Sequence, residues 1–299
     1  MKILTVDVGG TFIKYAVMNE NAKIFQRGKI PTPLDTRQNF FNAIKNIYEK
    51  ISVEGIALSL PGVIDSARGI CVKSAALSFN NDCNIVRELG EICTCSVTIE
   101  NDARCAALAE AKFGSLADVD AGFVMVFGTM IGGAFVVNQK IYKGADNSAG
   151  EISFLRAGHN QKIFSDVCSV PSLLKGYAQI KNLSTENITG EKFFQAVNEN
   201  EIDALTCLDK FTRRIAEKIF NIQLIIDVAK FAIGGGISAQ KIFIDSIRDN
   251  LQKVYSECPI DFNHVEVVPC KFLNDANLIG ALANFMDNTV YKGKNFDGR

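Results

Sequence analysis

The chain contains the same short device twice: a strand, a tight turn rich in glycine and threonine, and a returning strand. The first copy is TVDVGGTFIKYAV at residues 5–17, and the second is FVMVFGTMIGGAFVV at residues 123–137. Two such β-turn-β units, each followed by α/β sequence, indicate an internal duplication with a ligand between the halves. A chain of 299 residues is also long for one core, which favours two domains.

The elements that follow each device alternate between strands and helices. In the first half the patterns predict strands at 2–8, 12–18, 22–30, 53–65 (ending at Pro61-Gly62) and 95–100, with helices at 36–51 and 101–114. In the second half they predict a hairpin within 121–144, helices at 170–181, 190–199, 201–228 and 273–286, and strands before Gly234 and at 265–270. Alternation of this kind is typical of an α/β fold with parallel strands.

The first turn has two interpretations. Gly9 and Gly10 let the backbone turn tightly and leave its N–H groups unobstructed, so the segment can be a plain hairpin with a polar rim. It can also be a phosphate cradle, in which those N–H groups and the Thr11 hydroxyl face an anion while Asp7 faces a metal.

Composition excludes several classes of function. The net charge is −1 and no stretch combines clustered Lys/Arg with aromatic residues, so we expect no nucleic-acid partner. With no secretory leader and no apolar run of membrane-spanning length, we expect a cytoplasmic protein without a membrane partner. Nine scattered cysteines without a CxxC pair favour reduced thiols. With only two histidines, His159 and His264, the chain cannot form a histidine-rich metal site, and we do not expect Ser-His-Asp hydrolysis.

Four separated segments carry a family resemblance: DVGGTFIK, ENDARCAALAE, GTMIGGA…GADNSAGEIS, and AIGGGIS followed by NDANLIGALA. In this order, from residue 3 to about residue 286, they resemble the ROK family of sugar kinases and sugar-responsive repressors, within the actin-like ATPase superfamily. The resemblance implies a two-domain α/β fold of ribonuclease-H type with ATP and sugar in the cleft between the domains. It places a smaller domain at 1–116 plus 287–299 and a larger one at 117–286, and it implies a homo-oligomer, often a dimer.

On the nucleotide side, the resemblance implies ATP and Mg²⁺ as cofactors of a sugar kinase. Asp7 would orient Mg²⁺, through water, while Gly9, Gly10 and Thr11 would lie near the β- and γ-phosphates. Further phosphate and nucleotide contacts would come from Lys14, Thr129, Gly132, Gly133, Gly234, Gly235 and Gly236. Lys14 can equally be a solvated strand lysine, and the triple glycine can be merely a flexible turn.

On the sugar side, the resemblance implies that Asp102 is the general base that takes the proton of the hydroxyl, which we expect to be the 6-OH of a hexose or β-glucoside. The alternative is an ordinary helix cap. Asn101 and Glu151 would bind sugar hydroxyls, and backbone at Gly62 would touch the sugar. One of Asn80, Asn81 or Asn84 would contact it too, of which we select Asn81.

The chain departs from the family pattern after Glu151. Many members continue with a Gly-His pair, a cysteine-rich zinc loop and a sugar-binding glutamate. Here Ser153 and Phe154 replace the pair, Ser165 stands near the glutamate position, and His159 with Cys168 cannot build a four-ligand site, so we expect no zinc. An apolar wall at Phe154 would accept a substituted sugar, as zinc-less β-glucoside kinases do.

Met130 is a second departure, because the family usually has glycine there. If the position requires positive φ, methionine is strained or shifts the phosphate loop, which argues against full activity.

Two rival functions remain. A non-catalytic sugar sensor of the ROK type would carry an N-terminal helix-turn-helix, for which the six residues before Asp7 leave no space. An actin-like ATPase that acts on no sugar would not need the END and AGEI segments.

Overall fold

The computed structural model describes residues 1–157 and 162–290, and it divides into two compact units. Unit 1 comprises Met1–Lys112, Lys143–Ser148 and the chain from Asp275 onward, and unit 2 comprises Phe113–Tyr142 and Ala149–Asn274. Each unit is described by itself below. The domain limits at 116 and 287 stay predictions, and the expectation for the tail after residue 290 lies outside the described residues.

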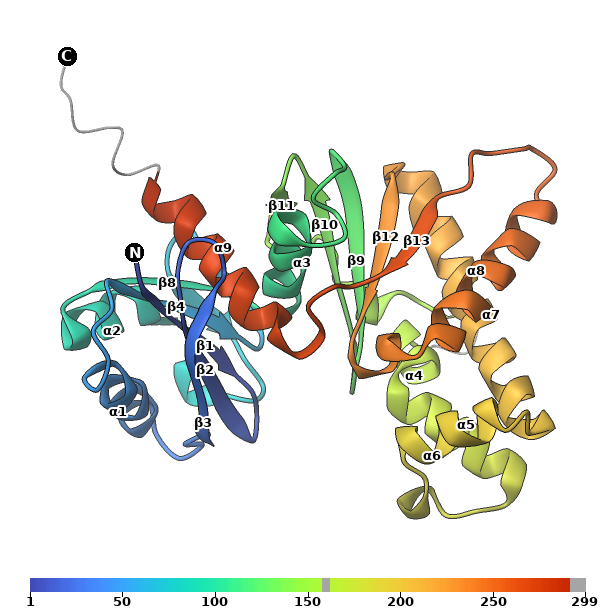
Figure 1. Ribbon diagram of the computed structural model, residues 1–299, viewed down its shortest axis with the longest axis horizontal. Coiled ribbons are helices and arrows are strands. Elements are labelled where there is room, and N and C mark those ends of the chain that lie inside the picture. The colour runs from blue at the N-terminus through green and yellow to red at the C-terminus, as the bar shows by residue number, and fades with distance from the viewer. Residues whose placement is uncertain (158–161, 291–299) are drawn as a thin grey trace. The chain divides into compact units, whose positions relative to one another are not determined.

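Unit 1 is built on a five-stranded sheet (Figure 1). Its strands, in the spatial order β3-β2-β1-β4-β8, are β3 (Ile24–Pro31), β2 (Phe12–Met18), β1 (Ile3–Val8), β4 (Gly55–Leu60) and β8 (Ser96–Asn101). The pairs β1·β2 and β2·β3 are antiparallel, and the pairs β1·β4 and β4·β8 are parallel. The predicted meander and the parallel strands that follow it are confirmed.

Helices cover both faces of this sheet, and all six residues of its central strand β1 are therefore buried. Leu4, Val6 and Val8 belong to one apolar core with α1 (Arg37–Tyr48) and α2 (Ile85–Cys93). The alternate residues of β1 face the other side, where α9 (Ala276–Val290) packs on β1, β4 and β8. On this side α3 (Asp102–Phe113) meets α9 closely, since a Cβ on Gly280 would lie 1.6 Å from the Cys105 carbonyl oxygen.

Unit 2 repeats this topology. The order β11-β10-β9-β12-β13 joins β11 (Lys140–Tyr142), β10 (Ile131–Val137), β9 (Ala121–Phe127), β12 (Lys230–Gly234) and β13 (Glu266–Pro269). Again two antiparallel pairs are followed by two parallel ones. The predicted repeat of the β-turn-β device is therefore confirmed, and each copy forms the centre of its own sheet.

The helices of unit 2 enclose a large apolar core. They are α4 (Phe164–Cys168), α5 (Val170–Lys181), α6 (Gly190–Asn198), α7 (Ile202–Ile226) and α8 (Lys241–Ser256). The predicted helices at 170–181, 190–199 and 201–228 are confirmed. The long α7 lies along α8 and buries Ile215, Ile219 and Ile222 in this core, as its helical spacing of isoleucines indicates.

Smaller elements connect these layers. A three-stranded sheet in unit 1 joins β5 (Val63–Asp65), β6 (Ile70–Lys73) and β7 (Cys83–Asn84). Single 3₁₀ turns occur at Ser78–Asn80, Ile152–Phe154, Thr185–Asn187, Gly236–Ala239 and Leu273–Asp275. Over the described residues, no helix is both long and apolar enough to cross a bilayer.

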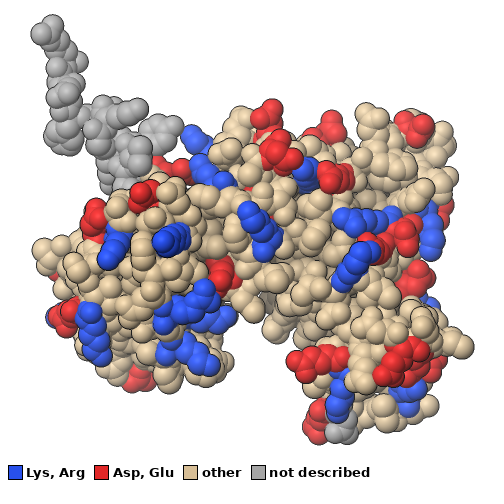
Figure 2. Space-filling view, in the orientation of Figure 1, with Lys and Arg blue, Asp and Glu red and all other residues tan. Residues whose placement is uncertain are grey.

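Charged side chains of both signs lie interspersed on the face of unit 2 shown in Figure 2. The ion pairs of unit 2 include Arg213 with Glu257 and Lys230 with Asp118, at 2.5 and 2.7 Å. That the chain has no nucleic-acid partner stays a prediction.

Candidate active site

Asp7 occupies the middle of a charged row that crosses the sheet of unit 1. In register, Asp7 pairs with Lys14 on β2 and with Ser59 on β4, so the three side chains share one face. The Ser59 hydroxyl donates to Asp7 Oδ1 at 3.2 Å, and Asn277 Nδ2 of α9 donates to the same oxygen at 3.0 Å. We call Ser59, Asp7 and Lys14 the charged row.

Burial dominates the electrostatics of Asp7, whose exposed fraction is 9%. Desolvation raises the pKa of its carboxyl above the ordinary value, against the opposing effects of Asn277, Lys14 and Ser59. A buried carboxylate of this kind suits a cation, because Mg²⁺ prefers oxygen ligands and retains much of its water. These residues therefore fit a magnesium ion held through water.

The glycine turn next to Asp7 is ordered by the chain itself. Gly9 N–H donates to the Phe12 carbonyl at 3.0 Å, and Thr32 bonds both the Gly9 and Thr11 carbonyls, at 2.7 and 3.0 Å. A Cβ on Gly10 would meet nothing within 4 Å, and Thr11 is exposed. The turn is thus fixed on its inner side and open on its outer side, which fits a phosphate group.

Ser59 and Asn277 were not predicted as site residues from the sequence. Ser59 lies in an otherwise apolar strand, and its only signal is a hydroxyl within the run IALSL. Asn277 lies in the first turn of α9, within the NDANLIGALA segment that contributes to the family resemblance. Only the register of β1 with β4 and the packing of α9 bring both side chains to Asp7.

Asn101 and Asp102 form a corner where β8 ends and α3 begins. Asn101 Oδ1 accepts from Arg104 N–H at 3.1 Å, and Asn101 Nδ2 donates to Asp102 Oδ1 at 2.9 Å and to the Gly62 carbonyl at 3.0 Å. Asp102 Oδ1 also accepts from Ala103 N–H at 2.8 Å. The bond that caps the helix start therefore comes from Asn101, while Asp102 is half-buried at the first helical position.

Gly62 is required by the fold of unit 1 itself. Its φ is +113°, and a Cβ there would lie 2.3 Å from the Lys73 carbonyl oxygen. Its own carbonyl accepts from Asn101. A backbone contact between Gly62 and sugar stays a prediction.

The three asparagines near residue 80 have different surroundings. Asn81 Oδ1 accepts from Ser74 N–H at 2.8 Å, and Asn84 caps α2 by accepting from Arg87 N–H at 3.0 Å. Asn80 is fully buried, and neither its Oδ1 nor its Nδ2 has a hydrogen-bond partner among the described residues. An unsatisfied buried amide is costly, so Asn80, unlike Asn81 and Asn84, has buried polar atoms left for a further partner.

The corresponding turn of unit 2 carries no charge. At the position of Asp7, one step before the closing pair of the hairpin, β9 has Val126, which pairs with Gly132 on β10 and Gly234 on β12. We call Gly234, Val126 and Gly132 the glycine row. Thr129 is exposed in the turn, which closes through Gly128 N–H and the Met130 carbonyl at 2.9 Å.

Met130 is not strained. It is 48% exposed, and it is not among the described residues with positive φ. Backbone strain therefore gives no argument against activity at this position.

Glu151 follows a close backbone contact within unit 2. Gly150 has a φ of +89°, and a Cβ on it would lie 2.6 Å from the Gly133 carbonyl oxygen. Gly133 thus serves packing of the segment that leads to Glu151. The Glu151 side chain is exposed and forms no hydrogen bond or ion pair with the part of the chain that is described.

The residues that depart from the family pattern form a buried hydroxyl pair. Ser153 Oγ and Ser165 Oγ are 2.8 Å apart, and both accept from Ile131 N–H, at 3.2 and 3.0 Å. Ser165 therefore supports the start of β10. Phe154, next to this pair, is 59% exposed.

A zinc site finds no support in the residues that the structure describes, where no three His, Cys, Asp or Glu side chains gather to hold a metal ion. His159 lies outside the described residues.

The triple glycine has mixed surroundings. Gly235 has a φ of +92°, and a Cβ on it would lie 2.0 Å from the Phe127 carbonyl oxygen, so packing on β9 requires glycine here. Around Gly236, in contrast, a Cβ would meet nothing within 4 Å. Of the three, Gly236 is the position at which a ligand can approach the backbone.

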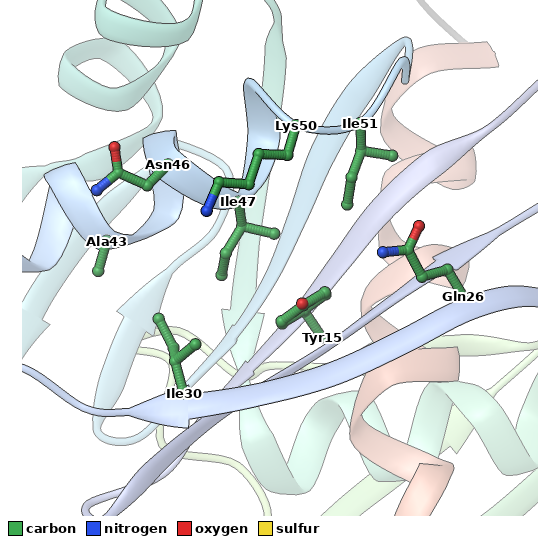
Figure 3. A pocket seen from close by; sticks show the side chains of 8 residues that line it. All are labelled: Tyr15, Gln26, Ile30, Ala43, Asn46, Ile47, Lys50 and Ile51. Atoms are coloured by element: carbon green, nitrogen blue, oxygen red, sulfur yellow. The ribbon is translucent and has the colours of Figure 1, made fainter.

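A separate cavity of about 300 Å³ lies between β2, β3 and α1 of unit 1 (Figure 3). Tyr15, Gln26, Asn46 and Lys50 supply its polar groups, and Ile30, Ile47 and Ile51 are among its apolar ones. None of the residues predicted for the site lines it.

Comparison with known proteins gives a match to the family model described as the ROK family, over residues 3–288. A beta-glucoside kinase of Listeria monocytogenes is 27% identical over 293 residues, covering 96% of this chain and 98% of the relative. An N-acetyl-D-glucosamine kinase of Vibrio atlanticus is 30% identical over 274 residues, covering 85% and 86%.

Solved structures show the same fold. A ROK family protein from Streptococcus pneumoniae, in complex with sucrose, has a TM-score of 0.89 at 24% identity and covers 97% of this chain and 100% of that one. A ROK family glucokinase from Streptomyces griseus, in complex with glucose and AMPPNP, has a TM-score of 0.81 at 22% identity and covers 94% and 98%. The α/β fold of the actin-like ATPase class, predicted from the sequence, is confirmed.

Proposed function

The chain belongs to the ROK family, and we propose that it is an ATP-dependent sugar kinase, which transfers the γ-phosphoryl group of ATP to a sugar hydroxyl. The observation that carries this proposal is the corner of Asn101 and Asp102, where a carboxylate is oriented by two donors at the first turn of α3. The N-terminus of a helix stabilises negative charge. A carboxylate oriented in this way can face the hydroxyl of a bound sugar and accept its proton.

Asp102 is assigned the role of taking the proton of the attacking hydroxyl. Phosphoryl transfer passes through a loose transition state, so the protein contributes mainly position and charge. A carboxylate within hydrogen-bond reach of the hydroxyl accepts the proton as the new O–P bond forms. The capping alternative loses support, because Asn101 Oδ1 already bonds the N–H of Arg104.

The nucleotide is assigned to residues in both units. In unit 1, Asp7 would hold Mg²⁺ through water, Lys14 would add positive charge, and the open turn of Gly9, Gly10 and Thr11 would accept phosphate. Bound Mg²⁺ would supply neutralisation of the phosphate charge. In unit 2, the exposed Thr129, Gly132 and Gly133, and the glycines from Gly234 to Gly236 would contact the rest of the nucleotide, with Gly236 the most accessible.

The sugar is assigned to Asn101, Asp102, Gly62, Glu151 and an asparagine near residue 80. Asn81 was selected from the sequence. The unpartnered amide of Asn80 makes it the better supported choice, since a sugar hydroxyl would satisfy it.

The proposed substrate is a hexose or a β-glucoside, phosphorylated at the 6-position. Three relatives at 27% identity are named beta-glucoside kinase. By the family resemblance, the exposed Phe154 and the buried Ser165 stand where many members have a histidine and, nearby, a sugar-binding glutamate. An apolar wall tolerates a substituent that a hydrogen-bonding wall would reject.

Two further properties are proposed with the function. All nine cysteines are free thiols, which supports a reducing, cytoplasmic location. A homo-oligomer, expected from the family resemblance, stays a prediction.

The test is ADP release from MgATP in the presence of glucose, fructose, N-acetylmannosamine, N-acetylglucosamine, cellobiose and an aryl β-glucoside. We expect sugar-dependent turnover, with cellobiose or the aryl glucoside preferred over free glucose. Faster turnover of glucose alone would overturn the β-glucoside preference. Absence of turnover with every sugar, combined with sugar binding by calorimetry, would replace the kinase with a sugar sensor.

A further inference from the structure

A buried carboxylate that the reaction does not use lies directly before the corner of Asn101 and Asp102. Glu100 is 1% exposed. Its Oε2 accepts from Lys143 Nζ at 2.6 Å and from the Ser66 hydroxyl at 3.0 Å, while its Oε1 accepts from the backbone N–H of Asn101 at 2.9 Å. A buried charge is tolerated only when it is paired and hydrogen-bonded, and Glu100 meets both conditions.

Arg104 adds a second buried charge to this cluster. Its Nη1 lies 3.6 Å from Glu100 Oε1 and donates to the Ile64 carbonyl at 3.4 Å, and its Nη2 donates to the Asn147 carbonyl. Lys143, whose side chain is 30% exposed, closes this buried pair from the surface side, and we call Glu100, Arg104 and Lys143 the buried triad. Its members come from the end of β8, from the first turns of α3 and from the segment Lys143–Ser148.

The segment Lys143–Ser148 has an unusual place in the chain. The residues before and after it belong to unit 2, while the segment itself belongs to unit 1. Lys143, its first residue, forms an ion pair with Glu100. The carbonyl of Asn147, one residue before its end, accepts a hydrogen bond from Arg104. Three residues after Ser148, the chain reaches Glu151.

We infer that the buried triad positions the corner that carries the general base, and that Lys143 is the positioning residue on which this depends; the inference rests on the proposed function. Glu100 fixes the backbone N–H of Asn101, and Asn101 in turn orients Asp102 Oδ1. Without Lys143, Glu100 loses its shortest ion pair. We then expect the side chains of Asn101 and Asp102 to become more mobile. Small misplacements of reacting groups reduce rate strongly.

The test compares Lys143→Met with Lys230→Met as a matched control. Lys230 also forms a short ion pair, with Asp118 at 2.7 Å, but belongs to unit 2 and to no predicted site. In Lys143→Met we expect kcat to fall about 30-fold, with the KM for ATP unchanged, and we expect Lys143→Arg to recover most of it. In Lys230→Met we expect kcat within twofold of wild type.

Ser66→Ala is the milder variant, which removes only one hydroxyl from Glu100 and Lys143. We expect kcat to fall about threefold, less than in Lys143→Met, because the ion pair between Glu100 and Lys143 is kept. If Lys143→Met does not fold, Ser66→Ala and Lys143→Arg decide the matter. Unchanged kcat in Ser66→Ala, or equal losses in Lys143→Met and Lys230→Met, would overturn the inference.

Hydrogen–deuterium exchange separates failure of this inference from failure of the proposed function. If the wild-type protein turns over no sugar, the proposed function fails, and the positioning of the corner is still measurable. We expect exchange at 100–104 and 143–148 to quicken in Lys143→Met but not in Lys230→Met. Unchanged exchange in these segments would contradict the inference whatever the activity.

Discussion

The sheets of the two units share one strand order but differ in the row of residues one step before the central turn. In unit 1 this is the charged row, with Asp7 between Lys14 and Ser59. In unit 2 it is the glycine row, with Val126 between Gly132 and Gly234. Equivalent positions of a repeated fold therefore carry opposite chemistry, one ionic and one without polar side chains.

The difference indicates a division of labour between the units. A buried carboxylate with a neighbouring lysine suits metal and phosphate, and Asp102, the proposed general base, lies in the same unit. In unit 2 the glycine open to a ligand is Gly236, two residues after the glycine row ends at the buried Gly234, and an open glycine suits close approach of the rest of a nucleotide. The topology thus provides the same sheet twice, and the proposal assigns metal and phosphate to the charged row of one unit and the rest of the nucleotide to the glycine turns of the other.

The largest expected effect concerns the base of unit 1. Asp102→Asn should lower kcat about 1,000-fold, because proton acceptance is lost while the shape of the side chain is kept. Steady-state ADP release measures it. Asp203→Asn, in the first turn of α7 of unit 2, is the matched control and should keep kcat within twofold. A loss below about tenfold in Asp102→Asn would leave the helix-cap interpretation standing.

Asp7→Asn tests the charged row, with an expected loss of about 100-fold in kcat/KM for MgATP. It should also raise Tm at pH 7 by about 1–3 °C. Burial raises the pKa of Asp7, so the folded state favours the proton, and the ionised form costs stability above the folded pKa. The gain should shrink as pH falls toward the ordinary value of 3.8.

Asp118→Asn is the control for this rise in Tm, because the pKa of Asp118 is shifted in the opposite direction to that of Asp7. A hydrogen bond from Lys230 lowers the pKa of Asp118, so the ionised form favours folding at neutral pH. Thermal unfolding should show no gain for this variant. If Tm rose equally in both variants, burial of the ionised Asp7 carboxylate could not be the cause of the gain in Asp7→Asn.

Gly236→Ala and Gly235→Ala separate binding from packing in unit 2. Gly236→Ala should fold normally and raise the KM for ATP about tenfold, because the added methyl enters open space that the nucleotide would occupy. Gly235→Ala should instead lose at least about 2 kcal/mol of folding stability, since its φ and its contact with Phe127 exclude a Cβ. Denaturant unfolding and ATP kinetics measure both. Unchanged ATP kinetics in Gly236→Ala would contradict the assignment of a nucleotide contact to Gly236.

Met130→Gly should have the smallest effect. Because Met130 does not have positive φ, glycine relieves no strain there, and we expect kcat within about twofold of wild type. A gain of tenfold or more would show that methionine does impair the loop.

Sequence patterns were sufficient for the repeated device, the long helices and the order of the motifs. Alternation and helical spacing are local properties, and α7 or the hairpin at Asn138 and Gln139 can be derived from them. The left-handed backbone of both these turn residues, with φ of 50° and 59°, agrees with the expected two-residue turn.

The surroundings of the site needed the structure. The charged row depends on the register of β1 with β4, and Asn277 arrives from the end of the chain, 270 residues from Asp7. The buried Glu100 and the contrast between Asn80 and Asn81 depend on packing, which no local pattern encodes. The helix α2 was missed because it has only nine residues, although Asn84 caps its start.

The most direct test of the division of labour is hydrogen–deuterium exchange of the wild-type protein with ligands. The probes are the best sugar of the panel and, separately, AMPPNP with Mg²⁺. The account predicts that sugar slows exchange at 78–84 and 100–104, and that the nucleotide slows exchange at 9–12, 128–133 and 235–240. Protection by the nucleotide in unit 1 alone, or no protection by sugar at residues 100–104, would contradict it.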